Sequence, residues 1–367
     1  MQPLLFTRLA RRSLLLSALC SAAGVPALPR RALQFPRDFG AHPDLRTEWW
    51  YLTGHATAGE RLFGFQLTFF RSRVDATQGM VSRLAAKQLI FAHAALTDVQ
   101  GNKLWHDQRI ARSAGVAELD LASASEQDTA IVLRDWSLQR ERGGYRARIA
   151  AADFQLELQL PERQPLLLQG AQGLSRKGPD AAQASYYYSQ PQLAVNGVIT
   201  LQGQRFKLDA SVANAAWLDH EWSEALLHPA AVGWDWIGMN LFDGSALTAF
   251  QLRDTTGAAL WDGGSFRAGG AHAKEAPYIF SRGAVLFRPL RRWKSPLSQA
   301  SYPVEWTVRT PADFYTVKAL IDPQELDSRA STGALYWEGL SDLFDSQGRH
   351  VGRGYLEMTG YAAALRL

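Results

Sequence analysis

The chain has 367 residues, of which 47% are hydrophobic and 20% are charged. The length suits two domains, and the composition excludes a disordered polyelectrolyte. The formal charge of +4 falls to +1 if a leader with three arginines and no acid is removed, so the charge does not favour nucleic acid as a partner.

Residues 1–27 have the features of a secretion signal. Arg8, Arg11 and Arg12 form a positively charged start, residues 13–23 are apolar, and Val25-Pro26-Ala27 offers a cleavage site. We therefore expect a periplasmic or secreted protein. The adjacent Arg11 and Arg12 leave both the Sec route and the twin-arginine route open.

The only cysteine, Cys20, lies inside this leader. A lipoprotein anchored at Cys20 is an alternative, which the large neighbouring Leu19 disfavours. If Cys20 is removed with the leader, the mature chain has no thiol for a disulfide, for catalysis or for a metal. No later segment is long and apolar enough to predict a membrane helix.

Signals for short strands dominate the chain beyond residue 47. Residues 154–160 alternate apolar and polar side chains, which predicts a strand with one buried face. The Gly143-Gly144 pair predicts a hairpin. Residues 83–96 fit either a helix or a strand preceded by a loop, and residues 164–185 are typical of a long loop. This pattern predicts an all-β fold of antiparallel sandwiches or barrels.

Aromatic motifs occur twice along the chain, which indicates two related β domains. We place them at residues 28–225 and 226–367. A cleft between two such units would suit an apolar ligand, and twelve tryptophans favour broad apolar pockets. The paired motifs are Trp49-Trp50 with Phe65-Gln66-Leu67, Trp234-Asp235-Trp236 with Phe250-Gln251-Leu252, and Tyr186-Tyr187-Tyr188 with Tyr336-Trp337.

The strongest candidate for chemistry is the segment from Trp217 to Trp222. In a strand, Trp217, Asp219 and Glu221 share one face, and Leu218, His220 and Trp222 share the other. Two carboxyl groups about 7 Å apart and away from water cannot both ionise cheaply, so one keeps its proton to a higher pH. Such an acid could protonate an alkene or an ether. The alternative is an ion pair of Asp219 or Glu221 with an arginine.

Other polar candidates lie in apolar surroundings. His93 could be a general base or a polar contact for a ligand, or a core histidine with satisfied hydrogen bonds. Asp235 could be a buried acid or half of a salt bridge. His55 is expected to face solvent. In the early aromatic cluster, Trp49 and Tyr51 share one face, and they could line a pocket or form an aromatic plug.

Several site classes find little support in the sequence. The neighbours Asp219, His220 and Glu221 point alternately in a strand, so they cannot all bind one metal ion. The chain has no HExxH motif and no Gly-x-Ser-x-Gly elbow. A glycine-rich phosphate loop before a helix is also missing. We therefore predict no metal and no cofactor.

The combination of these motifs resembles the carotenoid 1,2-hydratase/AttH-like family. The match extends from about Phe35 to Leu367. It rests on residues 42–54, on residues 185–191 around Tyr187, on residues 217–222, and on two C-terminal segments at residues 336–339 and 352–361.

The resemblance implies two lipocalin-like antiparallel β-barrel domains packed side by side. Family members include hydratases that add water to acyclic carotenoids, cyclases, and secreted proteins associated with ABC-type exporters of lipoproteins. In the hydratase branch an aspartate in an aromatic-x-Asp-His-Asn-Trp motif is the proposed proton donor, and this role falls on Asp219. Glu221 stands where that branch has asparagine, so the chain fits the secreted AttH-like branch better.

Together these inferences predict a protein that binds an elongated apolar ligand such as a lipid or an isoprenoid. In the catalytic hypothesis Asp219 donates a proton, Glu221 raises the pKa of Asp219, and His93 or His220 steers a water molecule. A carrier or an accessory protein of an ABC-type permease is the main alternative, and a purely structural β protein is the third. The expected ligand-binding residues are Trp49, Trp50, Tyr51, Tyr187, Trp217, Trp222, Trp234 and Trp236.

Overall fold

The chain folds almost entirely into antiparallel β-strands, so the all-β prediction is confirmed. The computed structural model describes residues 27–116 and 118–365, so the predicted leader lies almost wholly outside the described residues. No helix within these ranges is long and apolar enough to cross a membrane. The helices described there are three 3₁₀ turns, η1 (Arg37–Phe39), η2 (Asp75–Thr77) and η3 (Gly270–His272).

The first sheet has eight strands and provides the surface on which the candidate site is built. They are β1 (Thr47–Ala58), β2 (Arg61–Arg73), β3 (Gln88–Asp98), β4 (Lys103–Ser113), β10 (Leu167–Leu168), β11 (Leu174–Arg176), β12 (Ala184–Ala194) and β15 (Ala215–Ala225). Their order is β10-β12-β15-β1-β2-β3-β4, and β11 also pairs with β12. Residues 83–96 thus form a loop and then a strand. The predicted long loop at 164–185 contains two short strands, because its backbone pairs with β12.

The second sheet has seven short strands from the same half of the chain. They are β5 (Ala122–Ala124), β6 (Ala130–Leu133), β7 (Trp136–Arg140), β8 (Gly144–Ala150), β9 (Phe154–Pro161), β13 (Asn196–Leu201) and β14 (Gln204–Lys207). Their order is β14-β13-β9-β8-β7-β6-β5. The predicted alternation in β9 is confirmed, because every second side chain from Phe154 to Leu160 is buried.

The third sheet has ten strands from the second half of the chain. They are β16 (Gly233–Leu241), β17 (Ala246–Arg253), β18 (Ala259–Arg267), β19 (Tyr278–Ile279), β20 (Leu286–Pro289), β23 (Glu305–Arg309), β24 (Phe314–Ala319), β25 (Glu325–Ser328), β26 (Ala334–Phe344) and β27 (His350–Met358). Their order is β19-β18-β17-β16-β27-β26-β24-β23-β20, with β25 beside β26. The strands β21 (Arg292–Lys294) and β22 (Ser301–Pro303) form a separate hairpin.

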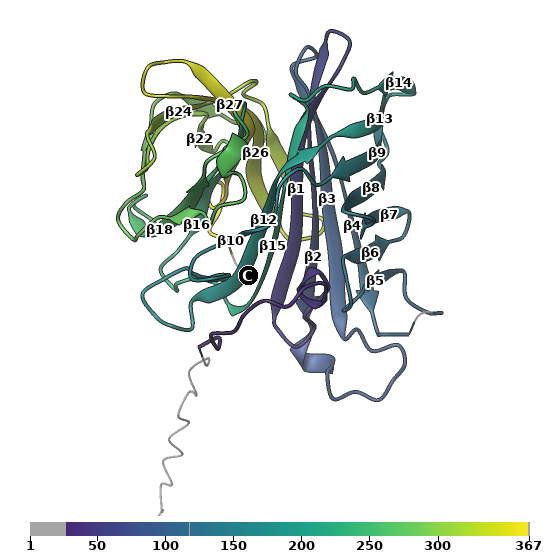
Figure 1. Cartoon of the computed structure of the whole chain (residues 1–367). Coiled ribbons are helices and arrows are strands. Elements are labelled where there is room, and N and C mark those ends of the chain that lie inside the picture. Colours follow the sequence, from purple (N-terminus) through teal and green to yellow (C-terminus); the bar gives the residue numbers. More distant parts are fainter. Residues whose placement is uncertain (1–26, 117, 366–367) are drawn as a thin grey trace, which may run out of the picture.

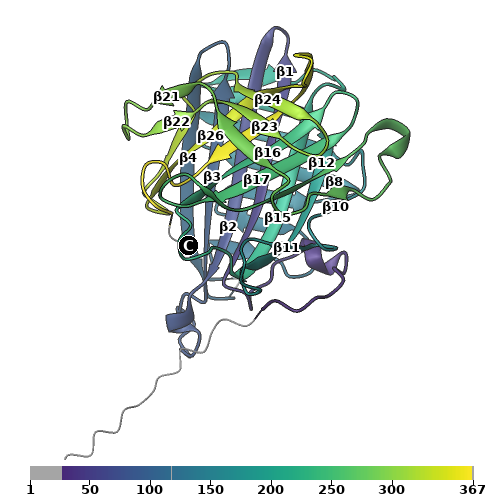
Figure 2. The same ribbon diagram turned by 90° about the vertical axis from the view of Figure 1, so that its left-hand side faces the viewer.

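The first sheet is the middle layer of the molecule. Figure 1 shows the second sheet on one side of it and the third sheet on the other, and Figure 2 shows the third sheet in front of the long strands of the first. The strand orders of the three sheets are open over the described residues. The domain boundary at residue 225 stays a prediction; β15 ends at Ala225 and β16 begins at Gly233.

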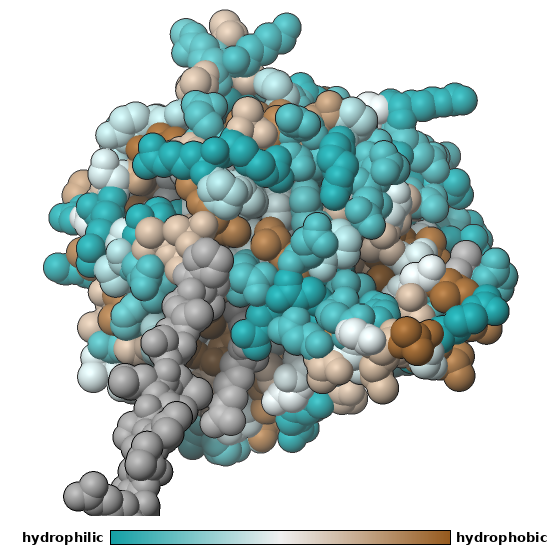
Figure 3. Space-filling model, turned by 90° about the horizontal axis from the view of Figure 1, so that it is seen from below, coloured by the Kyte–Doolittle hydropathy of each residue, from teal (hydrophilic) through white to brown (hydrophobic). Residues whose placement is uncertain are grey.

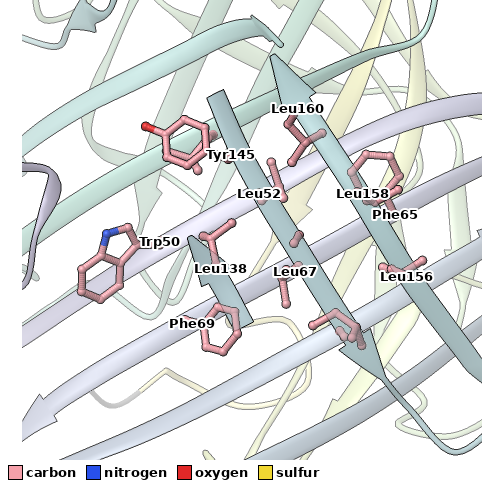
Figure 4. Close-up of a cluster of buried hydrophobic side chains, with 14 of the residues drawn as sticks. Trp50, Leu52, Phe65, Leu67, Phe69, Leu138, Tyr145, Leu156, Leu158 and Leu160 are labelled. Carbon is pink, nitrogen blue, oxygen red and sulfur yellow. The ribbon is translucent and has the colours of Figure 1, made fainter. Parts of the chain in front are cut away.

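Apolar clusters hold these layers together, and three of them are large. The largest lies between the first and second sheets, where side chains such as Leu52, Leu67 and Leu158 meet from strands that run across each other (Figure 4). A second cluster fills the inside of the third sheet. The third cluster joins Tyr51 and Trp217 of the first sheet to side chains of the third sheet. Burial of these apolar surfaces is the main force that fixes the layers.

The repeated motifs fall on equivalent positions in two sheets. In the first sheet β12, β15, β1 and β2 are neighbours, and in the third sheet β26, β27, β16 and β17 follow in the same order. Both Phe-Gln-Leu segments lie on the strand that pairs with a tryptophan-rich strand, β2 with β1 and β17 with β16. The two sheets therefore present related four-stranded units to each other.

The outer surface seen from below carries hydrophobic residues in small groups between hydrophilic ones (Figure 3). Scattered exposed apolar residues of this kind are normal on a folded protein. Between the first and third sheets, aromatic side chains lie together with buried acidic ones.

Candidate active site

One row of side chains across the first sheet, most of them polar, points toward the third sheet. Asp219 on β15 is paired in register with Tyr51 on one side and with Ser189 on the other. Because every second residue of a strand points to the same face, Trp217 and Glu221 face the third sheet together with Asp219. The row continues across β2, β3 and β4 through Thr68, His93 and Gln108.

Asp219 is buried and accepts three hydrogen bonds. The hydroxyl groups of Tyr187 and Ser189 donate to it at 2.7 and 2.6 Å, and the indole N–H of Trp217 donates at 2.7 Å. Burial raises the pKa of Asp219 to about 7, and the charge of Glu221 adds to this effect, although the three donors oppose it. Asp219 can therefore both give and take a proton near neutral pH.

Glu221 is buried beside Asp219, but it has a positive partner. Lys177 Nζ lies 2.9 Å from Glu221 Oε1, and the Ser185 hydroxyl donates to the same oxygen. The Lys177 ammonium group also lies 4.7 Å from the ring centre of Tyr187 and 4.3 Å from that of Phe250. Glu221 thus forms an ion pair, with a lysine where the alternative expected an arginine, whereas Asp219 has no arginine or lysine partner among the described residues.

Two glutamates of the third sheet face this pair, and the sequence reasoning missed both. Glu338 on β26 and Glu357 on β27 are direct register partners. Burial raises the pKa of Glu357 to about 8, and Asp219 and Glu221 add to the increase. Burial and the charge of Glu357 raise the pKa of Glu338 well above its ordinary value. Tyr51 reaches across from the first sheet and donates to Glu338.

A sequence signal for these glutamates existed. Both lie in the C-terminal segments that carry the family resemblance, and both stand in strands whose neighbours are apolar. Their partnership could not be predicted, because it depends on the register between β26 and β27 and on the packing of two sheets.

Aromatic side chains surround the four carboxyl groups. Trp236 lies in edge contact with Tyr51 and Trp217, at centroid distances of 5.2 and 6.4 Å, and its N–H points toward the Tyr187 hydroxyl at 3.4 Å. A side chain on Gly238 would overlap the Trp236 ring, so this glycine lets the indole lie flat on the sheet. Trp49 and Trp234 are partly buried in the same cluster.

The other expected residues lie on the opposite face of the first sheet. His220 Nε2 contacts Glu48 Oε1 at 2.8 Å, and its ring stacks on Trp50 at 4.4 Å. Trp222 stacks on His42 at 4.0 Å. His220, Trp50 and Trp222 therefore belong to the core of the first half, and the expectation that they share a site with Asp219 is wrong, because neighbours in a strand point in opposite directions.

Glu48 is the centre of this second network. It contacts His42 at 2.7 Å and Arg71 at 2.7 Å, besides His220. Hydrogen bonds from both histidines and the charge of Arg71 lower the pKa of Glu48, against the effect of burial. The atoms of His42, Glu48 and His220 are close enough to hold a metal ion. The guanidinium group of Arg71 on the same carboxylate disfavours a cation there.

His93 lies at the boundary between the first and third sheets, away from solvent. Its Nδ1 contacts the Tyr336 hydroxyl and its Nε2 contacts Ser331 Oγ, both at 2.8 Å. Burial lowers the pKa of His93 to about 3, so the ring stays neutral and joins the two halves by hydrogen bonds. His55, expected to face solvent, is buried as well, and its Nε2 lies 2.8 Å from the Ala213 carbonyl oxygen.

Asp235 is buried outside the carboxyl cluster and makes an ion pair. Arg253 Nε lies 2.7 Å from it, and Gln251 and Tyr361 donate to it at 2.8 and 2.9 Å. Burial raises its pKa, and Arg253 opposes this rise. The side chain is thus held by donors on all sides, which suits a structural role.

Two grooves open at the junction of the halves. One has a volume of about 350 Å³ and is lined by residues 169–176 of the first half and by β17, β18 and the segment 279–282 of the second. The other has a volume of about 530 Å³ and lies beside His106, Gln108 and Asp327. Phe250 connects the first groove to the carboxyl cluster, because the Phe250 ring contacts Lys177.

The comparisons with known proteins agree with this architecture. The AttH-like family model matches residues 26–361. An AttH-type protein from Nitrosomonas europaea is 46% identical, with a TM-score of 0.82 over 92% of this chain and 99% of that one. Among curated protein sequences none matches the chain.

Two more distant structures share the fold. Kievitone hydratase from Nectria haematococca is 12% identical, with a TM-score of 0.64 over 93% of this chain and 95% of that one. The protein CghA is 10% identical, with a TM-score of 0.51 over 88% and 89% of the two chains. At these identities the likeness concerns the fold alone. The family match and the close relative together show that this chain belongs to the AttH-like family.

Proposed function

We propose that the protein is an acid catalyst that protonates a carbon–carbon double bond of an apolar, elongated ligand, such as a lipid or an isoprenoid, held between the two halves. The observation that carries the proposal is Asp219, a buried carboxyl group with a pKa of about 7 among aromatic rings. A carboxylic acid that keeps its proton near neutral pH is what protonation of an alkene requires.

The reaction balances as a hydration. Asp219 gives its proton to one alkene carbon, and the neighbouring carbon becomes a cation. The faces of Trp217 and Trp236 and the remaining carboxylate charge stabilise this cation. Water then adds to the cation and loses a proton to the Asp219 carboxylate, which restores the acid. If a second double bond attacks the cation instead, a ring forms and the positive charge moves to a new carbon. Loss of a proton from the adjacent carbon to the Asp219 carboxylate then restores the acid and leaves a cyclic isomer.

The resemblance to hydratases of acyclic carotenoids supports this substrate class but does not fix it. Glu221 stands where those enzymes have asparagine, and in this chain it pairs with Lys177 at 2.9 Å. The ion pair adds a dipole but no net charge next to the acid. Its negative end, the Glu221 carboxylate, lies on the same strand face as Asp219, where it can face a ligand that becomes cationic during the reaction.

The test is turnover of an acyclic polyene, lycopene in detergent micelles, in water enriched in ¹⁸O. The expected product is a tertiary alcohol that carries one ¹⁸O atom, or a cyclic isomer of unchanged mass. Asp219→Asn is expected to lower the rate by roughly 10² to 10⁴. Glu224→Gln, on the same strand but at the sheet end beside Arg73, is the matched control and should keep the rate.

A lipid carrier or an accessory protein of an ABC-type permease is the second candidate. The groove of about 350 Å³ at the junction supports it, because a carrier needs the space and not the acid. Lipids extracted from the protein after expression with its leader would then be bound equally by the wild type and by Asp219→Asn. Equal retention with no product in the ¹⁸O experiment would refute catalysis.

We also propose a periplasmic or secreted location, on the basis of the leader-like residues 1–27. The experiment is fractionation of cells that express the full chain. Recovery of a shortened mature protein outside the cytoplasm supports this location, and an uncleaved cytoplasmic chain contradicts it.

A further inference from the structure

The smaller groove at the junction combines an apolar wall with two arginines. The wall contains Leu174 from the first half and Phe250, Ile279 and Phe280 from the second. Its volume of about 350 Å³ lies at the lower end of the range for small-molecule sites. Because both halves build the groove, a ligand in it would contact both sheets.

Both arginines lie near one indole ring, that of Trp261. Arg176 belongs to β11 of the first sheet, and Arg282 belongs to the segment after β19 of the third sheet. The guanidinium carbons of Arg282 and Arg176 lie 4.6 and 5.5 Å from the ring centre of Trp261. Trp261 thus holds two positive charges from opposite sides of the junction at one rim of the groove.

These charges have no acidic partner within the described ranges. Arg176 donates only to the carbonyl oxygens of Gly178 and Pro179, at 2.9 and 2.8 Å, and its buried Nε has no hydrogen-bond partner there. The one carboxylate in the groove, Asp262, accepts the backbone N–H groups of Gly283 and Val285 at 2.8 and 3.0 Å. The rim therefore offers free N–H donors to an anion.

The same groove is linked to the acid by hydrogen bonds. Gln169 lines it, donates to Ser189 Oγ at 2.9 Å and accepts from Ser265 at 2.9 Å. Ser189 in turn donates to Asp219 at 2.6 Å. A molecule with its charged end at the rim would direct its apolar end along Phe250 toward the carboxyl cluster.

We propose that this groove binds the acidic head of an amphiphile, a single carboxylate or phosphate ester on an apolar chain, between Arg176 and Arg282. The proposal deepens the proposed function and rests on it only for the reaction at the apolar end. The ligand is then an anionic lipid or an isoprenoid acid, because a neutral hydrocarbon would leave both guanidinium groups without a negatively charged partner.

Calorimetric binding of matched decyl compounds to the full-length protein tests the proposal. Decanoate and decyl phosphate are expected to bind at least roughly tenfold more tightly than 1-decanol, as charge-assisted contacts with arginine allow. In the double variant Arg176→Gln, Arg282→Gln the preference should disappear while 1-decanol binds as before. Arg329→Gln, at the other groove, is the control and should keep the preference.

Three outcomes overturn the inference: equal affinity for decanoate and 1-decanol, a preference that survives in the double variant, or inorganic phosphate binding as tightly as decyl phosphate. The thermal midpoint of the double variant shows whether it is folded, and single Arg282→Gln, at an exposed position, provides a milder change. Asp219→Asn should retain the preference. If the protein turns over the polyene but does not prefer the anionic decyl compounds, only this inference is refuted. If it prefers them but shows no turnover, only the proposed catalysis is refuted.

Discussion

The two faces of the first sheet carry buried carboxyl groups in opposite states, Glu48 on β1 and Asp219 on β15. On the face toward the second sheet, Glu48 meets His220, His42 and Arg71, and its pKa is lowered. On the face toward the third sheet, Asp219 meets only neutral donors, and its pKa is raised to about 7. The two sites are neighbours in register, since Trp50 pairs with His220 and Tyr51 with Asp219.

This difference shows that burial alone does not decide the charge of an acid. Both groups lose water, which favours the neutral form, but only Glu48 gains cationic partners that compensate for the loss. On the face that carries Glu48, cationic partners balance the buried charge and the residues form a structural network. On the face that carries Asp219, no cation pairs with the acid, so Asp219 can exchange protons, which is the property a catalytic site needs.

The largest expected loss of stability follows a change of Glu48, the buried carboxylate that has cationic partners. Glu48→Gln leaves Arg71 buried without its counter-charge, and removing one partner of a buried ion pair costs about 3–5 kcal/mol. Urea unfolding at pH 7 measures this loss. Glu224→Gln removes a more exposed pair with Arg73 and should cost less than about 1 kcal/mol. Similar losses for both variants would contradict the comparison.

The second prediction concerns pH and Asp219. Its pKa is raised in the folded state, so its contribution to stability is full below pH 4 and is lost as the pH rises to about 7. Asp219→Asn removes this loss. The stability of the variant relative to the wild type should therefore increase between pH 4 and pH 7, by roughly 4 kcal/mol in total at about 1.4 kcal/mol per pH unit. A difference independent of pH would mean that Asp219 is ionised throughout.

The third prediction separates neighbouring tyrosines on opposite faces. Tyr187→Phe removes one donor to Asp219, and since that donor lowers the pKa, the pKa of Asp219 should rise by up to about one unit. The carboxyl ¹³C shift of labelled aspartate, followed through a pH titration, reports it. Tyr186→Phe changes a hydroxyl that donates to Pro29 on the other face and should leave the titration of Asp219 unchanged.

The smallest effect is expected at Glu338. Burial raises the pKa of Glu338 well above its ordinary value, which favours the neutral form, and glutamine retains the acceptor for Tyr51. Glu338→Gln should change the free energy of unfolding by less than about 1 kcal/mol, because glutamine has nearly the shape of the neutral acid and the substitution breaks no ion pair. If this variant is as unstable as Glu48→Gln, Glu338 carries a charge and the contrast between the two faces fails.

Much of the fold could be predicted from local patterns. The alternation from Phe154 to Leu160, the hairpin turns and the duplicated aromatic motifs predicted an all-β chain with two related units, because side-chain period and turn chemistry are local properties. The same alternation correctly separated Asp219 from His220. Local patterns failed at His55, because the third sheet packs close to the face of β1 that carries it.

The candidate site could be predicted only in part. The sequence by itself determined that Asp219 and Glu221 share a strand face, because successive side chains of a strand point to opposite faces whatever the rest of the chain does. Only the tertiary structure decided that Lys177 pairs with Glu221, that Glu338 and Glu357 lie opposite the face that carries Asp219, and that Arg176 and Arg282 both lie near Trp261. These contacts join residues far apart in the chain, and their distances follow from strand register and sheet packing rather than from any local preference.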